Sequence, residues 1–436
     1  MRGSRSHRSA IVLNSVRVAS GGAIQTQRVF RIKPAVGVEH LTQATEIGSP
    51  ETARFLPMGT LFALSVQVLG NIIGYLSPRE AIALSYTCKA LHTHSLDPAL
   101  HTVVLDRTYG QIQKFRDYLL ATESRPGYLK SLVLVKAVTG EVGYDSSESA
   151  NALADILEKA ANLQRFDCGY MGIFNRVLNT ERVAYALVAL KKLREVNLRG
   201  VGTEIIKAIV SMDSLGLQTL SISFHHCEDM FETFFRPLAR YVHLHTLSIG
   251  ASSDRFRLRM PAEQLQDLIA IHSVRTLTID GITIPLSSVA YMFPNVKRIN
   301  YQSLRSERDR IAGPGLGLAN PLVPALPPSW THTLNRANLD VADLDIWPLT
   351  SRVNWLDIGL LPTGRSREAL LLIGQTNPRV LSCAYRVDAV NLLWKDLWTV
   401  ATDLRFLDVR IIELSGRPKV GIVFCFVHST WAHHSS

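Results

Sequence analysis

The sequence predicts an α/β fold, in which a small helical unit is followed by an irregular solenoid built from a curved parallel sheet lined by helices. Two observations carry this prediction. Closely spaced helical patterns with capping signals occupy residues 64–105, and a six-residue strand motif then recurs along the chain with helical patterns between its copies. With 47% hydrophobic and 19% charged residues, the composition is that of an ordinary globular protein, so most of the chain can bury a core.

The N-terminal residues 1–55 show little periodicity and are predicted to form a disordered basic tail. The formal net charge is +10, and seven basic residues lie between Met1 and Val38, where no acidic residue occurs. The rest of the chain is therefore nearly balanced and has no obvious footprint for phosphates, so no nucleic-acid partner is expected. An Arg-rich, acid-free start is also typical of a mitochondrial transit peptide, and that alternative stays open.

Residues 56–110 are predicted to form the helical unit. Apolar residues fall on one side of a helix over residues 64–76, at 3.6-residue spacing. Residues 77–80 are typical of a helix start, because Ser can cap, Pro suits the first helical position and Glu stands where a capping-box carboxylate reaches back. A second helical pattern follows over residues 81–91.

Residues 111–415 are predicted to form the solenoid. The repeated motif is an apolar residue, two variable or polar residues, and then an alternating apolar stretch. Its fourth positions lie 22 to 34 residues apart between Leu132 and Ile299, which matches a leucine-rich repeat of about 20 to 29 residues with some insertions. The copies begin at Leu129, Leu163, Leu193, Leu217, Leu244, Val274, Val296, Val353, Pro378 and Leu404.

The third motif position is polar in nearly every copy. Strand alternation turns it away from the core, so these side chains should line a concave wall that suits a protein partner. The residues are Ser131, Arg165, Glu195, Thr219, Thr246, Thr276 and Arg298.

Three segments depart from the repeat rhythm. Residues 311–329 are rich in Pro and Gly and are predicted to form a loop, whereas residues 335–344 are a candidate for one more degenerate repeat. Residues 416–436 are predicted to be a tail or a cap.

No run of about 18 apolar residues is present, so no membrane partner is expected. The five scattered cysteines suit a reducing compartment, which favours a cytoplasmic or nuclear location.

Residues 64–81 resemble the first half of an F-box, residues 84–91 its second half and residues 97–101 its end. Ser65 and Gln67 stand where the family usually has Pro and Glu, which leaves open whether such an F-box functions, and Leu91 stands where Trp is common. The repeats resemble those of F-box proteins that carry leucine-rich repeats.

The resemblance implies a non-catalytic substrate-recognition subunit of a Skp-cullin-F-box ubiquitin ligase. The helical unit would bind a Skp-type adaptor, and the repeats would hold a substrate protein whose identity and contact residues the sequence does not give. Residues at positions that match the family's adaptor contacts are Leu64, Val68, Leu69, Ile72, Leu76, Pro78, Leu84 and Cys88. Some of these, Leu69 and Leu84 above all, could instead form the unit's own core.

No catalytic, cofactor or metal site is predicted. The Gly-rich residues 313–317 lack the spacing of a phosphate loop, and the metal-capable residues 225–229 have no second cluster at zinc spacing. No G-x-S-x-G elbow is present. Two alternatives remain, a non-catalytic repeat scaffold outside ubiquitination and a mitochondrially targeted protein.

Overall fold

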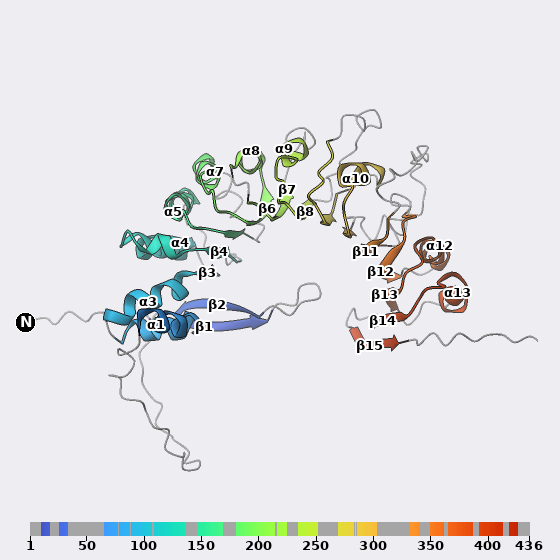
Figure 1. The fold of residues 1–436 in the computed structure, drawn as a ribbon, viewed down its shortest axis with the longest axis horizontal. Coiled ribbons are helices and arrows are strands. Elements are labelled where there is room, and N and C mark those ends of the chain that lie inside the picture. Colours follow the sequence, from blue (N-terminus) through green and yellow to red (C-terminus); the bar gives the residue numbers. More distant parts are fainter. Residues whose placement is uncertain are drawn as a thin grey trace, which may run out of the picture. The chain divides into compact units, whose positions relative to one another are not determined.

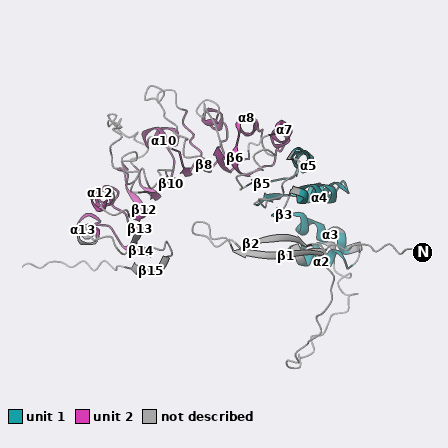
Figure 2. Ribbon diagram, turned by 180° about the vertical axis from the view of Figure 1, so that it is seen from behind, with its two compact units in different colours: residues 1–177 teal, residues 178–436 magenta. Residues whose placement is uncertain are grey.

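The structure is a computed structural model of the chain. It describes residues 10–17, 26–33, 65–76, 78–87, 89–106, 109–135, 146–168, 180–213, 216–224, 234–251, 269–282, 284, 286–302, 332–340, 349–361, 365–386, 392–412 and 418–425. The fold is α/β, as the sequence predicts, with parallel strands flanked by helices in a solenoid-like arrangement. The chain divides into two compact units, residues 1–177 and 178–436 (Figure 2).

The first unit contains three consecutive helices in the segment predicted to be helical. They are α1 (Val66–Gly74), α2 (Pro78–Ser85) and α3 (Lys89–Leu100). Helix α1 begins after Ser65, whose Oγ accepts a hydrogen bond from the Val68 N–H at 3.3 Å, so the residue that departs from the F-box pattern caps this helix. The predicted cap at Ser77 lies outside the described residues.

The same unit continues directly into parallel strands. Its further elements are β3 (Thr102–Leu105), α4 (Tyr109–Leu120), the 3-10 helix η2 (Arg125–Tyr128), β4 (Ser131–Leu134), α5 (Ser146–Lys159) and β5 (Arg165–Cys168). Strand β4 pairs in parallel with both β3 and β5. Strand β3 follows α3 after a single residue, and both belong to the first compact unit, which extends to residue 177.

Two strands lie inside the segment for which a disordered tail was predicted. Strand β1 (Ala10–Arg17) and strand β2 (Thr26–Lys33) pair antiparallel, with Ala10 opposite Lys33 and Arg17 opposite Thr26. Both segments are rich in β-branched residues, which favour extended backbone. The density of basic residues predicts a disordered tail, and the strand propensity of these two segments was the competing signal.

The second unit repeats one strand-and-helix plan. Strands β6 to β14 each pair in parallel with the next, and β15 pairs antiparallel with β14. Figure 1 shows the helices of this unit on one face of its sheet. The strands are β6 (Glu195–Val201), β7 (Thr219–Phe224), β8 (Thr246–Ala251), β9 (Thr276–Asp280), β10 (Arg298–Gln302), β11 (Leu334–Leu339), β12 (Val353–Leu361), β13 (Val380–Arg386), β14 (Phe406–Ile412) and β15 (Pro418–Cys425). The helices are α7 (Glu181–Val188), α8 (Thr203–Ser211), α9 (Arg236–Leu238), α10 (Leu286–Met292), α12 (Ser366–Thr376) and α13 (Leu392–Val400).

The motif read from the sequence matches the strand register. Equivalent fourth positions are direct partners in neighbouring strands, for example Leu220 with Leu247 and Leu381 with Leu407. These side chains are fully or almost fully buried toward the helices. The alternate residues point away from the helices, and we call the surface they form the open face.

A strand is confirmed at the start of the candidate repeat 335–344, because β11 pairs with β10 and β12, and residues 341–344 lie outside the described residues. The copy that begins at Pro378 is also confirmed as strand β13. Strand β15 lies within the predicted tail or cap and pairs along the outer edge of β14. The Pro- and Gly-rich segment 311–329 lies outside the described residues.

Register between repeats is set at one backbone carbonyl per strand. The N–H groups of Gln218 and Thr219 both donate to the carbonyl of Arg194, at 2.8 and 3.0 Å. The N–H groups of His245 and Thr246 donate in the same way to the carbonyl of Gln218. We call this two-donor contact at the second motif position the carbonyl joint. In the part of the chain that is described, no helix is long and apolar enough to cross a membrane.

Candidate functional site

Helix α1 exposes an apolar face to solvent. Val68 is 44% exposed, Ile72 is 42% exposed and Tyr75, just after the helix, is 91% exposed. Val68 and Ile72 are four residues apart, so they lie next to each other on one side of the helix. No residue of this helix is charged. The exposed face is therefore a candidate contact surface for an apolar partner groove.

The opposite side of α1 forms the core of the helical unit. Leu69, Ile73 and Leu91 make a buried cluster, and Leu76 and Leu84 pack against it partly buried. Of the predicted adaptor contacts, Val68 and Ile72 are thus exposed together, whereas Leu69 is 7% exposed and belongs to the core. The remaining predicted contacts are undescribed, since Leu64 and Cys88 lie outside the described residues and the side chain of Pro78 is not described.

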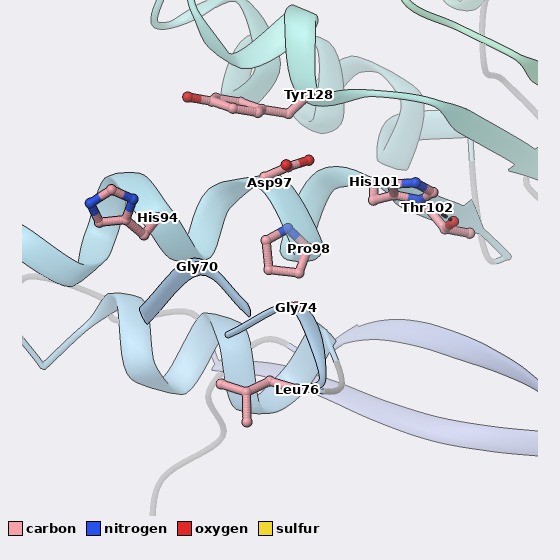
Figure 3. Close-up of a pocket in the computed structure, with 9 residues that line it drawn as sticks. All are labelled: Gly70, Gly74, Leu76, His94, Asp97, Pro98, His101, Thr102 and Tyr128. Atoms are coloured by element: carbon pink, nitrogen blue, oxygen red, sulfur yellow. Dashed lines mark hydrogen bonds between the residues drawn. The ribbon is translucent and has the colours of Figure 1, made fainter. Parts of the chain in front are cut away.

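An open cavity of about 690 Å³ lies between α1 and α3 (Figure 3). Gly70 and Gly74 form its wall on α1, and a Cβ atom added at either position would meet nothing within 4 Å. This cavity was not predicted, although two glycines four residues apart on the uncharged helix α1 were a visible signal. The other lining residues are Leu76, His94, Asp97, Pro98, His101, Thr102 and Tyr128.

The polar groups of this cavity come mainly from one side of α3. Burial, and to a smaller extent the charge of Lys130, lowers the pKa of His101, while Asp97 acts in the opposite direction. His101 is therefore neutral at physiological pH, and its Nδ1 lies 3.2 Å from the Thr102 hydroxyl. Among the described residues no group of three His, Cys, Asp or Glu side chains could hold a metal ion.

The open face of the second unit changes character along the sheet. On β7 to β9 it presents small hydroxyl side chains, as Thr219, Thr246 and Thr276 occupy equivalent positions in neighbouring strands. At the corresponding position of β12 and β14 stand Trp355, 38% exposed, and Phe406, 46% exposed.

Trp355, Val380 and Phe406 are direct neighbours across β12, β13 and β14, and we call these three residues the Trp355 patch. The Arg336 guanidinium stacks over the Trp355 ring at 4.3 Å from its centroid. The indole Nε1–H donates to the Ser382 hydroxyl at 3.0 Å. The ring is thus held on both sides, which fixes its orientation before any partner binds.

Charged side chains border the Trp355 patch along the strands. Toward the strand ends, Asp357 lies 3.6 Å from Arg336 and Asp408 lies 3.7 Å from Arg410.

A scan against models of known protein families finds no match to the chain, and a search of curated proteins finds no similar sequence.

Proposed function

We propose that the protein is the substrate-recognition subunit of a Skp-cullin-F-box ubiquitin ligase, and that it is not itself catalytic. The observation that carries the proposal is the exposed, uncharged face of α1, in a helical unit that precedes the repeats in the chain. Val68 and Ile72 lie outward although the helical unit has its own core, so they are available to a partner. An apolar helix face of this kind suits insertion into a partner groove, here that of a Skp-type adaptor.

The repeats supply the second half of the function. The open face carries exchangeable side chains on a scaffold whose core and register do not depend on them. Such a surface suits recognition of a substrate protein, which the adaptor and the cullin complex would then present for ubiquitination.

The test is co-purification of the full chain with a purified Skp-type adaptor. The double variant Val68→Asp with Ile72→Asp should lower affinity by at least about tenfold, since it places two charges in an apolar contact. Both side chains are more than 40% exposed, so the variant should keep its fold, which circular dichroism checks. Val242→Asp and Leu371→Asp, at exposed apolar positions 64% and 63% accessible, are the matched controls and should bind normally.

A repeat scaffold outside ubiquitination is the second candidate. The carbonyl of His101 accepts from the N–H groups of Lys130 and Ser131, which is the same carbonyl joint that links the later repeats. The helical unit is therefore connected as a first repeat would be, and could serve as a cap of the solenoid. Failure of the folded wild-type chain to bind the adaptor would reject the ligase function and favour this one.

A further inference from the structure

In the described part of the second unit, the aromatic side chains of the open face lie in one place. Among its described side chains there, only Trp355 and Phe406 are aromatic, and Val380 lies between them. Large aromatic residues and Arg dominate binding energy at protein interfaces, particularly where they are held in place beforehand. Trp355 is held by Arg336 and Ser382, so the Trp355 patch already has the properties of a binding site.

Among the described charged side chains around the Trp355 patch, some form ion pairs and others do not. Asp357 and Asp408 each lie within ion-pair distance of an arginine on the same face. Asp403, at the strand starts, pairs with Arg352.

Arg379 and Arg405 immediately precede Val380 and Phe406, and both are exposed. Within the described part of the chain neither guanidinium has an ion-pair or hydrogen-bond partner; their backbone groups, by contrast, form the carbonyl joint. Among the described residues, the charge without a partner at these strand starts, next to the Trp355 patch in the chain, is therefore positive.

We propose that the Trp355 patch docks an acidic segment of a partner protein that carries a large apolar side chain. The apolar side chain contacts Trp355, Val380 and Phe406, and the acidic residues beside it pair with Arg379 and Arg405. This inference rests on the proposed function only in identifying that partner as the substrate. Charge complementarity selects an acidic segment, because a basic one would leave both arginines unpaired.

A nucleic acid is the less suitable occupant. On the other side of the same patch Asp357 and Asp408 each lie beside an arginine, so that side offers the phosphates of a polyanion no uncompensated positive charge. A protein segment can place its carboxylates on one side only, next to the two arginines.

The experiment selects short random peptides displayed on phage against the purified full chain. Selected peptides should be acidic and contain Leu, Phe or Trp. Their affinity should fall at least about tenfold in Phe406→Ala and in Arg405→Glu, since each removes one half of the contact. Leu371→Ala and Arg367→Glu make the same changes at exposed positions of α12, on the helical face, and should leave affinity unchanged.

Three results would overturn the proposal. They are selection of no peptides or of neutral or basic ones, equal losses in the control variants, and stronger binding of oligodeoxythymidine than of the selected peptides. The readout contains no adaptor, so it is independent of the proposed ligase function. If the chain binds the peptides but not the adaptor, the docking site is supported and the ligase function is rejected. If the chain binds the adaptor but not the peptides, the ligase function is supported and the docking site is rejected.

Discussion

Strands β7 to β9 and strands β11 to β14 have the same architecture and different surfaces. Both sets are parallel, and both bury an apolar side chain at the fourth motif position, which is leucine in every strand except β11, where it is Ala337. On the open face the first set presents threonine and serine, whereas the second presents Arg336, Trp355 and Phe406. The difference shows that burial toward the helices sets the repeat, whereas the open-face residues can vary without changing the core.

The largest effect should come from the shared core. Leu247→Ala in β8 and Leu407→Ala in β14 should each lower the free energy of unfolding by about 2 to 5 kcal/mol, because both remove a buried side chain and leave a cavity. Urea denaturation followed by circular dichroism measures the two costs. A cost below about 1 kcal/mol at either site would contradict the idea that the two regions have equivalent cores.

A smaller effect should distinguish the two open faces. Trp355→Ala loses the stacking of Arg336 and the hydrogen bond to Ser382, and should cost about 2 kcal/mol. Thr246→Ala, at the equivalent position of β8, should cost less than about 1 kcal/mol. The same denaturation measurement gives both values, and equal costs would show that the patch residues contribute no more to the fold than the hydroxyl residues do.

The smallest effect concerns the sixth motif position, which also faces the core. Cys383 of β13 stands there, where β7 to β9 have isoleucine. Burial, and then the charges of Asp357 and Asp408, raises the pKa of Cys383 to about 12. The reactive thiolate should therefore be scarce at about pH 8, and alkylation by iodoacetamide should be more than about a thousandfold slower than in the unfolded chain.

Mass spectrometry of the peptide containing Cys383, from native and urea-unfolded protein, measures the two rates. Asp408→Asn should lower the pKa slightly without making the thiol reactive, since burial is the main cause. Rapid labelling of the native wild-type protein would mean that β13 opens readily, and that it is less stable than its neighbours.

Much of the repeat architecture could be predicted because it depends on local spacing. The six-residue motif located strands β4 to β10 and β12 to β14, because the burial of alternate residues produces a recognisable pattern in the sequence, and residues 335–344, which contain most of β11, were a candidate for a further degenerate copy. Val68 and Ile72 were named only through the resemblance to an F-box, as adaptor contacts, and their exposure was not predicted, because helical periodicity alone does not tell which apolar residues face the core and which face solvent.

Features that depend on packing between elements could not be predicted. The burial of Leu69 is set by its contacts with Leu91 on α3, and the cavity beside Gly70 and Gly74 exists only because α3 lies across from them. The pairing of β1 with β2 was missed for the same reason, since a single extended segment does not reveal its partner. The Trp355 patch needs three strands in register, and each of its residues is unremarkable when read alone.

The carbonyl joint has a consequence for how such a chain can change length. Two successive N–H groups of each strand bind one carbonyl of the strand before it, so backbone hydrogen bonds set the register between neighbouring strands. This register does not depend on the number of residues between the two strands. The spacing between copies, which varies from 22 to 34 residues, shows that tolerance directly. Duplication or loss of one whole segment between joints preserves the pairing on either side, so recombination can extend or shorten the array without redesigning its interior.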